Sequence, residues 1–198
     1  MQKELVYMSD HIDFYFDIIS PYAYIAHKKI LSHKNIIFNY KPIFLGGLHN
    51  LAGIDAPAFN EYKMKNMIND CKLVSMKNNI DFKWNIKFPI NSLSLMRGYL
   101  IVEDNLKQKY FEICFDSYWK DNVDISDEKN IFKILEKVEV DQEQFYKKIQ
   151  EKETKDELKK LTDEAFNKDI FGAPTFVVNQ KIFWGQDRLE YALDEYYS

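Results

Sequence analysis

The stretch "YFDIISPYAY", residues 15–24, joins a strand pattern directly to a helix start. Residues 11–17 alternate and are rich in aromatic side chains and isoleucine, which is typical of a β-strand. Pro21 suits the first position of a helix, where its missing N–H is not needed, and Ser20 before it is a good cap. We therefore predict a strand that ends near Asp17 and a helix from Pro21 to about Leu31.

Further strand patterns lie near both ends of the chain. "NIIFNYKPIF" at residues 35–44 completes a β-α-β unit, which in one sheet requires parallel strands and a right-handed crossover. "PTFVVNQKIFWG" at residues 174–185 predicts a hairpin that turns at "NQ". "QDRLEYALDEYY" at residues 186–197 predicts a last amphipathic helix.

The region between these ends has a helical pattern. From Pro57 to about Lys168, apolar residues recur at three- and four-residue spacing. Asp141 and Thr154 have the character of helix caps, because an acidic or amide side chain follows each about three residues later. We therefore expect a block of several helices without strong strand signals.

The order β-α-β, helical block, β-β-α is that of an α/β, thioredoxin-like fold with a large α-helical subdomain inserted between the βαβ and ββα halves. The chain has 198 residues and 46% hydrophobic content, enough for one sizeable core. We predict a single unit over residues 1–198, with the thioredoxin-like part at about 10–50 and 170–198 and the helical insertion at about 55–169.

Composition excludes several function classes. The net charge of −4, with lysines interleaved among acidic residues, argues against a nucleic-acid partner. No apolar run is long enough to span a membrane, and the N-terminus lacks a signal peptide pattern, so we expect a cytoplasmic protein with no membrane partner. Cys71 and Cys114 lie far apart, which indicates core thiols, and the four histidines show no spacing of metal ligands.

Ser20 is the first candidate for chemistry. In such a sheet, ligands bind beyond the carboxyl ends of the strands, where Ser20 falls. The start of the following helix offers unpaired N–H groups and the positive end of its dipole, which stabilise an anion such as a thiolate. Ser20 is then either a hydrogen-bond donor to that anion or an ordinary helix cap, and these residues alone leave both readings open.

Two further motifs accompany Ser20. In "FGAPTF", Pro174 is the first residue of a predicted strand. The matching proline of thioredoxin-like proteins is cis and faces the start of the first helix. A cis bond there leaves the backbone of Ala173 free to pair with an extended peptide. In "WGQDRLEYAL", Gln186 and Asp187 open the last helix. Asp187 is either a routine cap or, with Gln186, holds the carboxylate and ammonium of a γ-glutamyl group.

Five stretches together carry a resemblance over nearly the whole chain: "FYFDIISPYAYIA", "YKPIFLGGL", "EYKMKNMINDCK", "KFPINSLSLMR" and "FGAPTFVVNQKIFWGQDRLE". They resemble the glutathione-dependent 2-hydroxychromene-2-carboxylate isomerases, relatives of the kappa-class glutathione transferases in the DsbA-like branch of the thioredoxin fold. In this family serine replaces the active-site cysteine of the oxidoreductases, and bound glutathione supplies the thiol. The resemblance also implies a homodimer.

The resemblance implies a role for each motif. Ser20 contacts the glutathione sulfur, and Lys63 in "EYKMKNMIND" contacts the glycyl carboxylate. Without the resemblance, Lys63 would be interpreted as a solvent-exposed helix lysine. Ala173, ahead of cis Pro174, pairs with the cysteinyl backbone. Gln186 and Asp187 hold the γ-glutamyl end. The implied reaction is a reversible conjugate addition of the thiolate to an aromatic unsaturated keto acid.

On the substrate side the sequence is less specific. Tyr22 and Trp184 flank the site motifs and are candidates for an aryl pocket, and Arg97 either pairs with a substrate carboxylate or ties two helices together. Further aromatic candidates are Phe44, Trp84 and Phe88. The family asparagine after "LGGL" is replaced around Ile54 and Asp55, and Asn50 is a candidate substitute.

Two other functions use the same residues. A kappa-like transferase or peroxidase would consume glutathione at the same site, and only its products would distinguish it. A non-catalytic thioredoxin-fold protein would bind extended peptides beside Pro174. Lys63, Gln186 and Asp187 favour a glutathione-binding protein over the peptide-binding one.

Overall fold

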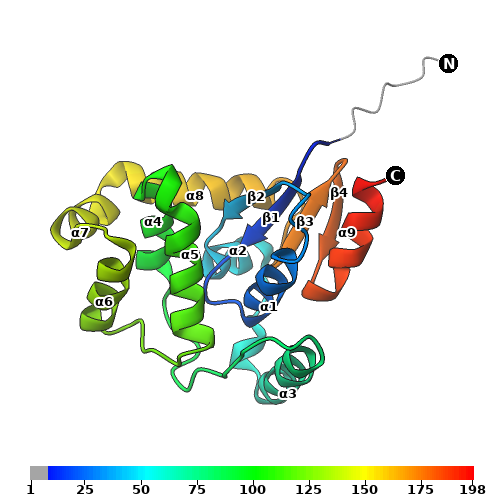
Figure 1. Ribbon diagram of the computed structural model, residues 1–198, viewed down its shortest axis with the longest axis horizontal. Helices are drawn as coiled ribbons and strands as arrows, with labels where there is room; N and C mark the ends of the chain where they lie inside the picture. The colour runs from blue at the N-terminus through cyan, green and yellow to red at the C-terminus, as the bar shows by residue number, and fades with distance from the viewer. Residues whose placement is uncertain (1–8) are drawn as a thin grey trace.

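A computed structural model describes residues 9–198 and contains one four-stranded sheet with the strand order β2-β1-β3-β4 (Figure 1). Residues 1–8, on which the expectation of a missing signal peptide partly depends, lie outside the described residues. Within residues 9–198, no helix combines the length and the apolar character needed to cross a membrane.

The sheet confirms the predicted β-α-β unit and the C-terminal hairpin. Strand β1 (Ile12–Phe16), helix α1 (Pro21–Ile30) and strand β2 (Phe38–Pro42) form the unit, with β1 and β2 parallel. Strand β3 (Thr175–Val178) runs antiparallel to β1 and continues into β4 (Lys181–Trp184).

The hairpin turns at Asn179 and Gln180, which have φ values of 48° and 63°. Positive φ at both central residues is what a two-residue turn between twisted strands requires, and asparagine tolerates it better than most residues. The turn therefore sets the register in which Thr175 faces Trp184.

The helices lie around this sheet. Figure 1 shows α4 to α7 gathered beyond the β2 edge and α9 at the β4 side. Their bounds are α2 Leu45–Ala52, α3 Glu61–Lys77, α4 Leu93–Ile101, α5 Asp104–Trp119, α6 Glu128–Val138, α7 Gln142–Gln150, α8 Lys152–Phe166 and α9 Leu189–Tyr196, with short 3-10 turns at Pro57–Phe59 and Gln186–Arg188. Phe16 of β1 joins the sheet to α5, because its ring centroid lies 4.6 Å from that of Phe111.

Two details of the middle region differ from the sequence prediction. Residues 79–92 form no helix: Asn79 adopts a left-handed φ of 53° just after α3, and the Phe88–Pro89 peptide is cis. The predicted cap at Thr154 is wrong, since α8 already begins at Lys152 and Thr154 is buried inside it. The cap at Asp141 is confirmed, because its carboxylate accepts the N–H of Gln144 at 2.8 Å.

Asp17 ties together the elements that meet at the carboxyl end of β1. It is fully buried, and its carboxylate accepts the N–H of Ile19 at 3.1 Å and the N–H of Leu45, the first residue of α2, at 2.8 Å. Its backbone carbonyl accepts the N–H of Ser20 at 3.0 Å. One residue therefore fixes the starts of both α1 and α2.

Burial raises the pKa of Asp17 from 3.8 to about 6, although the N–H donors of Leu45 and Ile19 act in the opposite direction. A carboxyl group with a raised pKa in the folded state binds a proton that the unfolded chain has already released. The contribution of this group to stability is therefore complete below its unfolded pKa and is lost as the pH rises through its folded pKa.

The quantity to compare is the free energy of unfolding of the wild type less that of Asp17→Asn. We predict that this difference falls by on the order of 3 kcal/mol as the pH rises from about 4 to above 6. Asparagine has nearly the same shape but does not titrate. Urea denaturation of both proteins at a series of pH values measures this difference. A difference that stays level or increases with pH contradicts the prediction.

Candidate active site

Ser20 has two hydrogen-bonding roles at the start of α1. Its Oγ accepts the N–H of Ala23 at 3.2 Å, so it caps the helix, and its hydroxyl donates to the backbone carbonyl of Ala173 at 2.8 Å. Only 4% of Ser20 is exposed. The Ala173–Pro174 peptide is cis and faces the start of α1, as predicted. The cap and the possible ligand contact therefore belong to one hydroxyl.

The edge of the sheet also brings Gln186 and Asp187 to this region. The N–H of Gly185 donates to the carbonyl of Pro174 at 2.9 Å, which extends the pairing of β3 with β4 by one step. Gln186 and Asp187 follow directly in the 3-10 turn that precedes α9. The two predicted motifs, separated in sequence by the hairpin, thus lie at one end of the same strand pair.

Gln186 is held by Lys29, a residue that the sequence reading did not single out. The Lys29 ammonium donates to the side-chain carbonyl oxygen of Gln186 at 2.5 Å, and Gln186 is only 8% exposed. Burial lowers the pKa of Lys29, while the carboxylates of Glu190 and Asp187 oppose that effect. The two partners are 157 residues apart, so no local spacing could have revealed the pair.

The Lys29 contact fixes which way the Gln186 amide points. An ammonium only donates, so it must face the carbonyl oxygen, and the NH₂ group is then the end left for another partner. Among residues 9–198 the Gln186 NH₂ donates no hydrogen bond. Beside it, the half-exposed carboxylate of Asp187 pairs with its neighbour Arg188 at 3.3 Å. An amide donor next to a carboxylate suits a zwitterionic amino-acid group.

Lys63 lies in the first turn of α3, where Asn60 caps the helix by accepting the N–H of Lys63 at 3.0 Å. Together with Asp55, Ala56, Phe59 and Asn60, it lines a hollow of about 340 Å³. Asp55, one of the two residues at the departure from the family pattern, is therefore a neighbour of Lys63.

The three residues predicted for the substrate pocket have different surroundings. The Tyr22 hydroxyl donates to Asp70 of α3 at 2.8 Å, which ties α1 to α3. The half-exposed Trp184 packs on Phe171, with ring centroids 4.8 Å apart. Arg97 lies on α4 and lines a pocket of about 540 Å³ between α2, α4 and α8.

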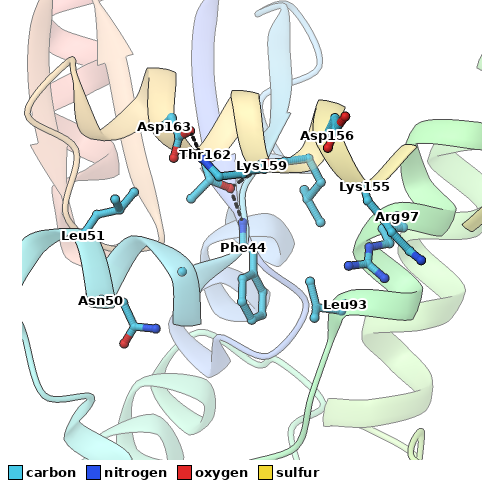
Figure 2. A pocket seen from close by; sticks show the side chains of 12 residues that line it. Phe44, Asn50, Leu51, Leu93, Arg97, Lys155, Asp156, Lys159, Thr162 and Asp163 are labelled. Carbon is cyan, nitrogen blue, oxygen red and sulfur yellow. Dashed lines mark hydrogen bonds and ion pairs between the residues drawn. The ribbon is translucent and has the colours of Figure 1, made fainter. Parts of the chain in front are cut away.

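The other candidates named for the substrate side lie in two different places. Phe44 and Asn50 line the same pocket as Arg97 (Figure 2). Trp84 and Phe88 instead pack against Trp119, with ring centroids 5.6 Å away in each case, and belong to the core.

Neither cysteine offers a reactive thiolate at the start of α1. Cys71 and Cys114 are both unpaired and fully buried, as predicted. Burial raises the pKa of the Cys71 thiol to about 12 and that of Cys114 further. A nucleophile beside Ser20 must therefore come from a bound molecule or from a hydroxyl group.

Comparison with known proteins supports this assignment of the fold. The sequence pattern of the DSBA-like thioredoxin domain matches residues 11–197. A 2-hydroxychromene-2-carboxylate isomerase of Sphingobium xenophagum is 26% identical over 189 residues, which are 93% of this chain and 96% of the relative. Glutathione S-transferase kappa 1 of Caenorhabditis elegans is 25% identical over 203 residues, covering 92% of this chain and 89% of that protein.

A solved structure of a 2-hydroxychromene-2-carboxylate isomerase superposes with a TM-score of 0.82 at 19% identity and covers 92% of each chain. The sheet order, the position of Pro174 and the helices between β2 and β3 are thus features of a known architecture. The chain belongs to the DSBA-like thioredoxin domain family, with a thioredoxin-like α/β fold and with isomerase and kappa-class relatives.

Proposed function

We propose that this protein is a glutathione-dependent isomerase of the 2-hydroxychromene-2-carboxylate type. The observation that carries the proposal is the contact between the Ser20 hydroxyl and the carbonyl of Ala173 at the N-terminus of α1. A thioredoxin-like site with a serine there, and with both cysteines buried elsewhere, needs an external thiol. The isomerase and kappa-class relatives support glutathione as its source.

The residues of the site fit glutathione on its polar groups. The Gln186 NH₂, the end of the amide that Lys29 does not contact, donates to the γ-glutamyl carboxylate, and Asp187 accepts from the γ-glutamyl ammonium. The backbone of Ala173 pairs with the cysteinyl residue, and Lys63 neutralises the glycyl carboxylate. Each charged end of the tripeptide thus meets a group of complementary chemistry.

Binding requires Ser20 to exchange partners. In the free protein its hydroxyl donates to the Ala173 carbonyl, which is also the acceptor that a cysteinyl N–H needs. When the peptide N–H takes over this carbonyl, the Ser20 hydroxyl turns to the sulfur and stabilises the thiolate together with the positive end of α1. Ser20 remains the cap of α1 throughout, because its Oγ still accepts the N–H of Ala23.

When bound, glutathione supplies a thiolate for reversible conjugate addition to the double bond of an aromatic unsaturated keto acid, so that the bond can rotate before the thiolate leaves. The chain holds the thiolate charge at Ser20 and places the acceptor beside it. A kappa-like transferase or peroxidase is the second candidate, because a kappa-class relative matches at similar identity. A homodimer, which rests on the resemblance alone, and the cytoplasmic location expected from the sequence are further parts of the proposal.

Product analysis separates the two candidates. We predict that the protein interconverts 2-hydroxychromene-2-carboxylate and ring-opened benzylidenepyruvate with many turnovers per glutathione, because the thiolate is regenerated in each cycle. Chromatography of substrate, product and free thiol measures this ratio, and S-methylglutathione, which has no thiol, is the matched control. Loss of one glutathione per product would identify a transferase, and equal rates without glutathione would refute both candidates.

Lys29 should affect glutathione binding through Gln186. We predict that Lys29→Met weakens the binding of reduced glutathione about 5- to 10-fold, because the freed amide no longer presents its NH₂ in a fixed orientation. Asp187→Ala, which removes a direct charge contact, should weaken it by about 10-fold or more.

Isothermal calorimetry of the wild type and of each variant measures these affinities. Lys28→Met is the matched control, since Lys28 is the neighbouring lysine of α1 but pairs with Asp116 at 2.6 Å. Equal weakening by both lysine variants would show a general effect of charge on α1 and would contradict the role assigned to Lys29.

A further inference from the structure

Helix α3 carries Lys63 in its first turn and lies at the margin of the fold. In Figure 1 the helix is at the lower edge of the molecule, below α1. The segments on either side of it, residues 53–56 and 79–92, contain neither helix nor strand. Three residues of the helix are buried: Met67, Cys71 and Ser75. The position of Lys63 relative to Ser20 therefore depends on how α3 is fixed to α1.

Tyr22 provides a polar link between the two helices. It lies two residues after Ser20, in the first turn of α1, and its hydroxyl donates to the Asp70 carboxylate of α3 at 2.8 Å. Burial, and after it the hydrogen bond to Asp70, raises the pKa of Tyr22, so the hydroxyl stays protonated and remains a donor. A hydrogen bond to a charged acceptor is stronger than one between neutral groups. This bond therefore holds α3 against the start of α1.

Lys63 and Asp70 lie on nearly the same face of α3. They are seven residues apart, which is close to two turns of a helix with about 3.6 residues per turn. At about 1.5 Å per residue, the two residues are separated by on the order of 10 Å along the helix axis. Met67, between them on this face, is buried. The link from Tyr22 to Asp70 therefore sets the direction in which the first turn of α3, with Lys63, faces.

A second tyrosine of α1 is linked to the chain beyond the other end of α3. The Tyr24 hydroxyl donates to the backbone carbonyl of Asp81 at 2.7 Å, in the segment that follows the helix. This bond lies much farther from Lys63 along the chain than the Tyr22 bond does. Loss of the Tyr22 hydroxyl would therefore leave α3 attached, but with its first turn less firmly held.

We propose that Tyr22, through Asp70, is a positioning residue that makes the site selective for a thiol with a glycyl carboxylate. The inference rests on the proposed function, in which Lys63 binds that carboxylate. While Tyr22 holds α3 against α1, Ser20 and Lys63 keep a fixed separation, and the site is preorganised for both ends of the ligand. Without the link, glutathione keeps only the contacts that γ-glutamylcysteine also makes. The hydroxyl of Tyr22 thus serves α3, whereas the sequence suggested an aryl contact.

Calorimetry with two thiols tests this role. γ-Glutamylcysteine lacks the glycyl residue and is the matched ligand for reduced glutathione. We predict that the wild type binds glutathione about 10-fold more tightly than γ-glutamylcysteine. Tyr22→Phe should lower this ratio to about 3-fold by weakening glutathione alone, because the variant keeps the ring and the Tyr24 link but loses the bond to Asp70.

A double-mutant cycle with Lys63→Met separates positioning from a general loss of stability. Lys63→Met should bring the ratio close to 1, and Tyr22→Phe added to it should not weaken glutathione further, because the link acts through Lys63. Asp70→Ala should behave like Tyr22→Phe. Asp70→Asn, whose carbonyl oxygen still accepts from the hydroxyl, should retain most of the ratio.

Tyr110→Phe is the matched control. Tyr110 donates to the backbone carbonyl of Leu95 at 2.8 Å, a bond that joins α5 to α4 and involves neither α1 nor α3. Its loss should lower the stability of the protein and leave the ratio of the two affinities unchanged.

Three results would overturn the inference. They are equal affinities of the wild type for the two thiols, an unchanged ratio or an equal loss for both thiols in Tyr22→Phe, and a further loss from Tyr22→Phe in the Lys63→Met background. Failure of the proposed function gives a different result, because the wild type would then bind neither thiol.

Discussion

The buried carboxylate of Asp17 is the constraint on which the site depends. It lies at the end of β1, where the chain must turn into α1. It accepts the N–H of Ile19 within the turn and the N–H of Leu45 at the start of α2. A buried carboxyl is unfavourable unless such donors compensate it. The backbone that carries Ser20 and the backbone that carries Phe44 are therefore held at a fixed distance by one residue.

The sheet completes the site by joining segments from the two ends of the chain. Because β1 pairs with β3, Ser20 meets Ala173, which is 153 residues away. Because β3 pairs with β4, Gln186 and Asp187 come to the same end of the strand pair, and Lys29 of α1 orients the Gln186 amide. In the proposed function, Ser20, Ala173, Gln186 and Asp187 hold glutathione at this end of the strand pair.

Sequence patterns predicted the helix starts and turns that depend only on neighbouring residues. The Ser-Pro helix start and the hairpin at Asn179 each follow from the residues at one place in the chain. The cis Pro174 was expected from the likeness to thioredoxin-like proteins, and the structure has all three features. Thr154 failed as a cap because packing against the rest of the helical block, which buries it, outweighed its local preference. The contact of Lys29 with Gln186 and that of Tyr22 with Asp70 could not be predicted, since both depend on side chains that only the folded chain brings together.

The central claim is that the Ser20 hydroxyl stabilises a glutathione thiolate. The most direct measurement is the thiolate absorbance of bound glutathione as the pH is raised, in the wild type, in Ser20→Ala and in Ser20→Thr, which keeps a hydroxyl and a helix cap. The account predicts that the thiol pKa of bound glutathione lies below that of free glutathione in the wild type and in Ser20→Thr, and rises by about one unit in Ser20→Ala. An equal thiol pKa in the wild type and in Ser20→Ala would contradict it.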